Sequence, residues 1–361
     1  MPFPPALSRA SVRLCLDIEN IARKFRVAPD KNLLICLSGG SDSVALTALF
    51  SLLAPRRNLK LSALHINHNL RAEAEDDAKF ARDLCSSLHI PYYEESVPVA
   101  DIAKSSGKGL EETGRAARYQ AANHLADNIG ADYILLGHQL DDLCEDLVLR
   151  LLRGSGWPAL AGMRRREGRF FRPFLHVKSD VLRRFLREMN IPWRHDASND
   201  DLSFLRNRVR HQIVPALAAE NPSFTESARR LHIAANLDDE FWREYLESSL
   251  QSALREMKRD SSYCLIELKK ETLSSLHPAA RLRLYRLIVK ELIRVIPGGQ
   301  TRADALYQLD SALREGKSER LFQSPGNSGA LLRKGSIYFY KFNGEGGLRK
   351  IQEILNSKAI G

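Results

Sequence analysis

The chain has 361 residues, of which 44% are hydrophobic and 27% are charged, with 21 glycines and 15 prolines. This composition describes a globular protein with room for two or three domains, and it excludes collagen-like, coiled-coil and disordered chains. Lysine and arginine (54) outnumber aspartate and glutamate (44), which gives a net charge of +10. That excess favours a polyanionic partner such as RNA or DNA.

The cysteine spacing and the lengths of the apolar segments indicate in which compartment the protein is located. The five cysteines are scattered and never follow the C-x-x-C spacing, so no disulfide framework, zinc knuckle or iron–sulfur cluster is indicated. The N-terminal residues lack a basic region followed by a long apolar region, and no run of about 18 apolar residues occurs. We therefore expect a cytoplasmic protein without a signal peptide or a membrane span.

The first part of the chain, residues 1–220, alternates short apolar runs with segments of helical periodicity. This is the pattern of a parallel sheet covered by helices. The expected strands are 33–37, 61–66, 91–97, 133–136 and 170–171. The expected helices are 41–53, 75–88, 111–128, 141–152 and 179–189. The sequence thus predicts a doubly wound α/β domain.

The pattern changes near residues 221–222. Ser223 and Glu226 form a capping-box sequence that predicts a long helical stretch toward Met257. Two helices are expected within 278–314, and short strands after residue 316, with 337–342 the clearest. We therefore expect a catalytic domain over 1–220, a helical linker over 221–260 and a small α+β domain over 261–361 that binds RNA.

Residues 38–43, with the sequence SGGSDS, join a buried strand directly to a helix. Glycines and serine hydroxyls at such a turn bring donors close to a phosphate, and the helix N-terminus adds a partial positive charge. Neither the Walker lysine nor the G-x-G-x-x-G spacing is present. Asp42 inside an anion-binding loop is best explained if it holds Mg²⁺ against the same phosphates. The alternative is an ordinary turn in which Asp42 and Ser43 cap the helix.

This loop resembles the S-G-G-x-D-S loop of the PP-loop ATP pyrophosphatases, which have an adenine nucleotide alpha hydrolase-like fold. Enzymes of this class cleave ATP between the α- and β-phosphates and adenylate a substrate oxygen. The class includes GMP synthetase-type amidotransferases, tRNA thiolases and lysidine synthases. The loop alone does not choose among them.

Further segments between residues 30 and 222 resemble the lysidine synthase family. Residues 64–71 are similar to H-x-H-H-G-L-R, with Asn67 and Asn69 departing from it, and 110–119 are similar to L-E-x-x-x-R-x-x-R-Y. Residues 137–145 match H-x-x-D-D-x-x-E, although Gln139 and Leu143 differ from the usual residues. The segments 152–156, 172–175 and 193–211 resemble L-R-G-S-G, R-P-L-L and W-x-x-D-x-S-N followed by R-N-x-x-R. The last signature is associated with lysidine synthases and not with thiolases.

The resemblance implies roles for individual residues. The residues expected to bind ATP are Ser38, Gly39, Gly40, Ser41, Asp42, Ser43, Arg115 and Arg118. Asp42 and Asp141 would hold Mg²⁺, Asp142 and Glu145 would bind lysine, and these four carboxylates form the expected catalytic set. Arg206, Arg208 and Arg210 would contact tRNA phosphates.

Without the resemblance, each of these groups also has an ordinary structural explanation. Arg115 and Arg118 could belong to a solvated face, with Glu111 and Arg115 as an i,i+4 pair. Acidic residues at 141–145 could simply complement the helix dipole, and the arginines after residue 205 could be a solvated basic stretch.

The implied activity is ligation of lysine to C2 of the wobble cytidine in a tRNA(Ile) with a CAU anticodon, which changes the codon read from AUG to AUA. ATP and Mg²⁺ are the expected cofactors, and tRNA(Ile) and L-lysine the expected partners. Oligomeric state stays open, and a homodimer is compatible with the sequence. The alternatives are a tRNA thiolase of the same fold, which would need a reactive cysteine, and a non-catalytic RNA-binding protein.

Overall fold

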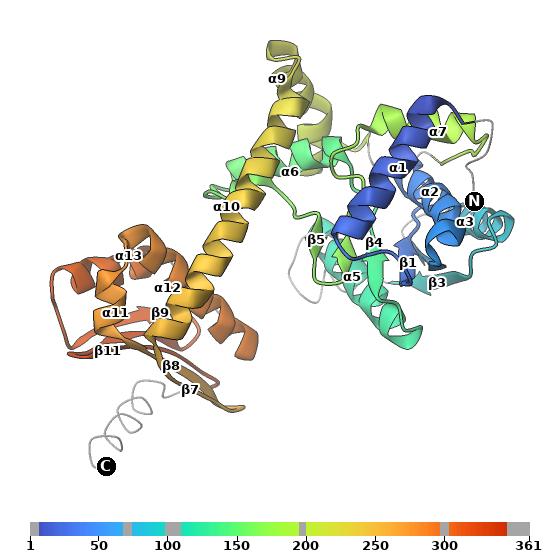
Figure 1. Ribbon diagram of the computed structural model, residues 1–361. Coiled ribbons are helices and arrows are strands. Elements are labelled where there is room, and N and C mark those ends of the chain that lie inside the picture. Colours follow the sequence, from blue (N-terminus) through green and yellow to red (C-terminus); the bar gives the residue numbers. More distant parts are fainter. Residues whose placement is uncertain (1–6, 68–73, 98–109, 195–199, 297–302, 345–361) are drawn as a thin grey trace. The chain divides into compact units, whose positions relative to one another are not determined.

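The computed structural model describes residues 7–67, 74–97, 110–194, 200–296 and 303–344, and the chain divides into the compact units Met1–Leu237 and Asp238–Gly361 (Figure 1). The division falls inside one long helix, α10 (Phe224–Ala253). The three-domain division expected from the sequence stays a prediction. Within the described residues, no helix is both long enough and apolar enough to cross a membrane.

The first unit is built on a six-stranded sheet in the order β3-β2-β1-β4-β6-β5. Its strands are β1 (Asn32–Cys36), β2 (Lys60–Asn67), β3 (Tyr92–Ser96), β4 (Tyr133–Leu135), β5 (Arg166–Glu167) and β6 (Phe170–Phe171). All neighbouring pairs are parallel except β5 with β6, a short antiparallel edge that the sequence did not predict. The strand order reverses between β1 and β4, and ligands of open α/β sheets bind where this happens.

Helices cover both faces of this sheet. They are α1 (Arg9–Lys24), α2 (Ser41–Arg57), α3 (Ala74–Ser87), α5 (Leu110–Asn128), α6 (Leu140–Leu152) and α7 (Ser179–Glu188). Leu33 and Ile35 of β1 join one core with residues of α1, α2 and α7, whereas Leu34 joins a second core with α5. The alternation of adjacent residues between two cores confirms the predicted doubly wound α/β fold. Only α1 among these helices was not predicted.

The rest of the first unit continues from α6 toward α10. It contains the short 3₁₀ helix η1 (Ala159–Ala161), α8 (Leu205–Arg208), a π-helical turn η3 (Val209–Ile213) and α9 (Val214–Glu220). Leu147 and Val148 of α6 pack with Val209 and with Ala228 of α10. This contact fixes residues 205–213 against α6, which carries the acidic motif.

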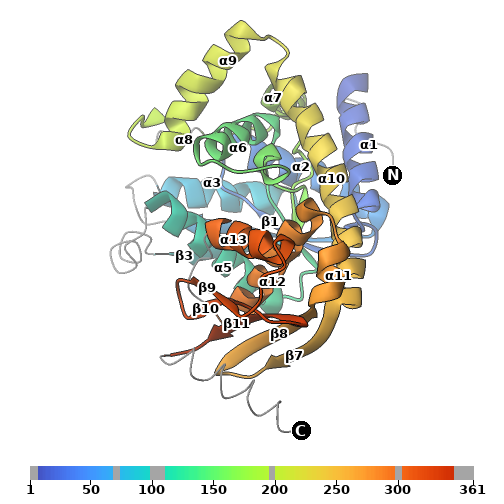
Figure 2. The ribbon, with the colours of Figure 1, turned by 90° about the vertical axis from the view of Figure 1, so that its left-hand side faces the viewer.

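The second unit is an α+β fold, as predicted. An antiparallel sheet in the order β7-β8-β11-β10-β9 packs on one face against helices (Figure 2). Its elements are β7 (Leu254–Arg259), β8 (Tyr263–Lys269), α11 (Lys270–Ser275), α12 (Pro278–Val295), α13 (Ala303–Arg314), β9 (Arg320–Ser324), β10 (Ser328–Leu332) and β11 (Ser336–Phe342).

The predicted helical stretch toward Met257 is wrong at its end, because α10 stops at Ala253. Residues 254–259 are good helix formers locally, but their backbone pairs with β8 along its length. Tertiary pairing therefore overrides the local helix propensity.

Glu226 in the first turn of α10 binds Arg229 through both carboxylate oxygens, at 2.8 and 2.6 Å.

Candidate functional site

The loop 38–43 lies between β1 and α2, at the centre of the sheet. Gly39 has φ +89°, a conformation that side chains disfavour. The Ser38 N–H donates to the Ser43 hydroxyl at 3.1 Å, and that hydroxyl donates to the Gly40 carbonyl at 3.0 Å. The loop is thus closed on itself, and the first turn of α2 begins at its mouth with N–H groups that have no helical partner.

The segment after β4 lies directly against this loop. A Cβ atom at Gly137 would sit 3.0 Å from the Ser43 nitrogen and 3.1 Å from the Asp42 carbonyl carbon. Only glycine allows the two backbones to approach this closely. The motifs at 38–43 and 137–145, almost 100 residues apart in sequence, are therefore brought together at the reversal of strand order.

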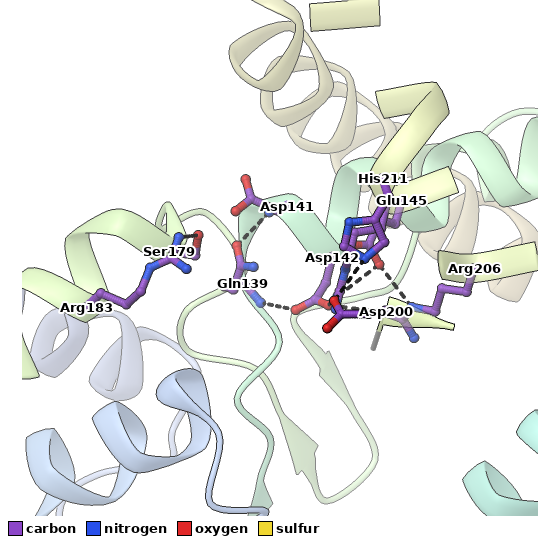
Figure 3. Close-up of polar contacts among 10 residues, drawn as sticks. Gln139, Asp141, Asp142, Glu145, Ser179, Arg183, Asp200, Arg206 and His211 are labelled. Carbon is purple, nitrogen blue, oxygen red and sulfur yellow. Dashed lines mark hydrogen bonds and ion pairs between the residues drawn. The ribbon is translucent and has the colours of Figure 1, made fainter. Parts of the chain in front are cut away.

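Asp42 is a carboxylate held in an unfavourable setting. Burial, together with the negative charge of Asp142, raises the pKa of the Asp42 carboxyl to about 7. The Ser41 hydroxyl donates to it at 3.2 Å and offsets part of this effect. Asp141, its predicted Mg²⁺ partner, points away from the group formed by Asp142, Glu145 and Arg206 (Figure 3). In the described part of the chain, no three metal-ligating side chains gather closely enough to hold an ion alone.

Asp142 and Glu145, the predicted lysine ligands, both bind arginines (Figure 3). Arg206 donates to Asp142 Oδ1 at 3.0 Å and to Glu145 Oε2 at 3.0 Å. Arg210 donates to Asp142 Oδ1 at 3.2 Å and to Glu145 Oε1 at 2.5 Å. The Gln139 N–H donates to the second oxygen of Asp142 at 2.9 Å, which fixes it in a capping box. The two carboxylates therefore form a buried receptor for cations.

The three arginines predicted to contact tRNA are divided between two faces. Arg206 and Arg210 are four residues apart and point to the carboxylates, as an i,i+4 pair should. Arg208 is half-buried and donates to the carbonyls of Leu202 and Ser203 at 2.8 and 2.7 Å. Their contact with tRNA stays a prediction.

Arg115 belongs to a network that the sequence did not reveal. Its Nη2 donates to the Tyr119 hydroxyl at 3.3 Å, and the same hydroxyl accepts from Arg172 at 2.8 Å. Arg172 is 1% exposed and also donates to the Arg164 carbonyl at 2.8 Å. Arg118 donates to the Gly114 carbonyl at 3.3 Å, close enough to Arg115 for the two charges to interact. In the sequence, Tyr119 and Arg172 were noticed only as members of two separate motifs, and their hydrogen bond was not predicted.

Of two histidines in the motifs, His65 is buried and His138 is half-buried. Burial lowers the pKa of His138 to about 3, so its imidazole is neutral, and its Nδ1 has no hydrogen-bond partner among the described residues. His65 Nδ1 donates to the Leu37 carbonyl at 2.9 Å and supports the strand that leads into the loop. The motif residues 68–71 and 195–199 and the side chain of Glu111 lie outside the described residues.

If Arg115 binds ATP, as the resemblance implies, Tyr119→Phe should raise the Michaelis constant for ATP roughly tenfold with a smaller effect on kcat, because Arg115 and Arg172 lose a shared acceptor. Steady-state pyrophosphate release over a range of ATP concentrations measures this. Tyr133→Phe is the matched control, since the Tyr133 ring contacts Arg166 at the far edge of the sheet. Equal constants for the two variants would contradict a positioning role.

The chain is similar to proteins of known function over most of its length. Residues 14–217 match the PP-loop domain family. A tRNA(Ile)-lysidine synthase of Nitratidesulfovibrio vulgaris is 39% identical over 318 residues, which cover 84% of this chain and 90% of that protein. A tRNA(Ile)-lysidine synthase of Treponema denticola is 40% identical, but the match covers 54% of this chain and 43% of that protein.

Among solved structures, the U34-tRNA thiolase NcsA from Methanococcus maripaludis is similar, with a TM-score of 0.53 and 16% identity. The similarity covers 62% of this chain and 79% of the thiolase. At this level of identity, the comparison supports the PP-loop fold and carries no information about substrate.

Proposed function

The chain belongs to the tRNA(Ile)-lysidine synthase family of PP-loop enzymes, and we propose that it joins L-lysine to C2 of the wobble cytidine in a tRNA(Ile) with a CAU anticodon. In the first step the C2 carbonyl oxygen attacks the α-phosphorus of ATP, and pyrophosphate leaves. In the second step the ε-amine of lysine attacks C2, AMP leaves with the former carbonyl oxygen, and the amine loses a proton. Adenylation is required because an amide-like oxygen is otherwise a poor leaving group.

The observation that carries this proposal is the cation receptor beside the phosphate loop. Asp142 and Glu145 lie on the segment that packs against loop 38–43, and Glu145 is 2% exposed. Two carboxylates at this depth are stable only when cations neutralise them. A lysine ammonium carries the same charge as the guanidiniums that the receptor holds, so lysine would enter by replacing one of them. Movement of residues 205–213 when tRNA binds would free that position.

Loop 38–43, together with Arg115 and Arg118 of α5, fits the ATP that the first step needs. The first turn of α2 would cradle the pyrophosphate portion, and Arg115 and Arg118 would steady the phosphates. Asp42 also fits Mg²⁺, because burial and the charge of Asp142 raise the pKa of its carboxyl more than the charges of Arg183 and Arg210 lower it, and a bound cation would offset this. Asp141 is the second proposed ligand, since Asp142 is already engaged by two arginines. Bound Mg²⁺ would neutralise charge on the phosphates, and it commonly uses one or two carboxylates together with phosphate oxygens.

A thiolase activity is less well supported. Burial raises the pKa of the Cys36 and Cys144 thiols to about 12, and that of Cys85 to about 11. A thiolate is the reactive form of cysteine, so these side chains are poor nucleophiles at neutral pH.

The decisive test is mass analysis of a tRNA(Ile) transcript incubated with the protein, ATP, Mg²⁺ and lysine. We expect the anticodon fragment to gain the mass of one lysine less one water, and not to gain this mass when ATP or lysine is omitted. A transcript with uridine at the wobble position is the matched control. Pyrophosphate release without a mass gain in the presence of lysine would reject the proposed ligation.

The proposed replacement of an arginine by lysine at Asp142 and Glu145 can be tested separately. Arg210→Gln removes a competitor for the carboxylates, so we expect the Michaelis constant for lysine to fall roughly three- to tenfold. Arg208→Gln is the control, because Arg208 points away from the receptor. If lysine dependence is the same in the two variants, lysine does not replace Arg210.

A further inference from the structure

A cavity with two arginines in its lining lies in the first unit, and no residue of the phosphate loop lines it. It has a volume of about 430 Å³ and is lined by one face of α1, by residues 165–177 and by the start of α10. Its polar lining residues are Asp17, Asn20, Arg165, His176 and Arg229. None of these residues has a role in the reaction proposed above.

Arg165 is the unusual member of this set. Its side chain lies in the cavity wall, the residue is 8% exposed, and burial lowers the pKa of its guanidinium to about 10. One nitrogen, Nη1, donates to the Pro173 carbonyl at 2.6 Å. Within the described ranges, no carboxylate lies within ion-pair distance of Arg165. A buried cation without a counter-charge is costly unless something neutralises it.

The neighbouring charged groups do not supply that neutralisation. Glu226 is held by Arg229 in a bidentate pair, and Asp17 lies on the exposed rim, 3.9 Å from Arg13. His176 also lines the cavity, and its pKa falls to about 3 through burial and through the charge of Arg165. Among the groups that line the cavity, Arg165 is therefore the positive charge that no carboxylate of the described residues offsets.

The cavity also has a rigid base. His176 and His232 are hydrogen-bonded through ring nitrogens 2.9 Å apart, and His232 Nε2 donates to the Met163 carbonyl at 2.9 Å. His232 belongs to α10, so this chain of hydrogen bonds joins α10 to the segment that carries Arg165. The Arg165 guanidinium itself is anchored by its bond to the Pro173 carbonyl, and a planar guanidinium suits the two oxygens of a phosphate group.

We propose that this cavity is a phosphate-binding site, in which Arg165 and Arg229 bind the oxygens of a phosphate group. The group comes either from the backbone of the tRNA or from free phosphate. Phosphate fits better than a carboxylate because the volume exceeds that of a small carboxylate and two arginines face it. The site does not depend on the lysidine reaction, and its test uses neither lysine nor adenylation.

The first arm of the test titrates inorganic phosphate into the full chain by calorimetry, with the phosphate loop filled by α,β-methylene-ATP and Mg²⁺. We expect Arg165→Met to weaken phosphate binding roughly tenfold or more, and Arg229→Gln to weaken it by a smaller factor. Arg230→Gln is the matched control, because Arg230 is exposed on the same helix and does not line the cavity.

The second arm measures tRNA affinity at several salt concentrations. If the ligand is a backbone phosphate, both cavity variants bind tRNA more weakly than Arg230→Gln, and the slope of log affinity against log salt falls by about one. An effect in the first arm alone identifies free phosphate. Should Arg165→Met not fold, as judged by its melting curve, Arg229→Gln alone decides both arms. The proposal is overturned when neither arm separates the folded cavity variants from Arg230→Gln.

Discussion

Asp42→Asn should reduce ATP-dependent adenylation of tRNA by a factor on the order of 10²–10³, while tRNA affinity changes less than about twofold. Asparagine keeps the shape of the side chain but removes the charge that would hold Mg²⁺ against the phosphates. The loop itself should survive, because its closing hydrogen bonds come from Ser38 and Ser43 and not from Asp42.

The same substitution should stabilise the free protein. Burial and Asp142 raise the pKa of Asp42 from its ordinary value of 3.8 to about 7, so the folded state favours the protonated carboxyl. The wild-type protein keeps this contribution to stability below about pH 3.8 and loses it as pH rises through about 7. Asparagine cannot ionise. At pH 8 we expect the variant to gain roughly 1 kcal/mol, or about 2–4 °C in Tm, with little gain at pH 4.

Pyrophosphate release and melting curves at pH 4, 6 and 8 measure the two effects. Asp180→Asn is the matched control, since Asp180 also lies in the first turn of a helix, α7, where it complements the helix dipole. We expect the control to lose slight stability and no activity. Near-normal adenylation by Asp42→Asn would reject its metal role, and an unchanged difference in Tm between pH 4 and 8 would reject the raised pKa.

The sequence predicted most of the first unit because its signals are local. Alternating apolar runs and the SGGSDS loop can be recognised from neighbouring residues in the chain, whereas the order of the strands within the sheet was not predicted. The position of the loop beside residues 137–145 follows from the strand-order rule. The end of α10 was missed for the opposite reason, because residues 254–259 form a strand only when β8 is present to pair with them.

The candidate site was predicted as a set of residues but not as a set of contacts. Asp142 and Arg206 are 64 positions apart, and no local pattern indicates that they bind each other. Tyr119 and Arg172 are 53 positions apart, and their hydrogen bond likewise depends on the folded chain. No sequence pattern singled out Arg165. It stands out only in the folded protein, because its side chain is buried and no carboxylate of the described residues pairs with it.

Glu145→Gln should raise the Michaelis constant for lysine roughly ten- to a hundredfold while lysine-independent adenylation persists. Glu145 is 2% exposed and accepts from Arg206 and Arg210, so its charge is stabilised only by bound cations. Glutamine keeps the hydrogen-bonding shape but leaves Asp142 as the single negative charge for three competing cations. The attraction for lysine then weakens, although the phosphate loop is untouched.

Asp146→Asn is the matched control for this prediction, because Asp146 is the next residue on the same helix and binds Arg150 at 2.8 Å. Both variants lose one carboxylate charge from α6, so a general change in helix charge would affect them equally. Initial rates of lysidine formation and of pyrophosphate release, each measured against lysine concentration, separate lysine binding from adenylation. A Michaelis constant for lysine that is the same in Glu145→Gln and Asp146→Asn would mean that Glu145 only anchors the arginines of residues 205–213. In that case Glu145→Gln should lower the melting temperature without changing lysine dependence, which the same preparations would show.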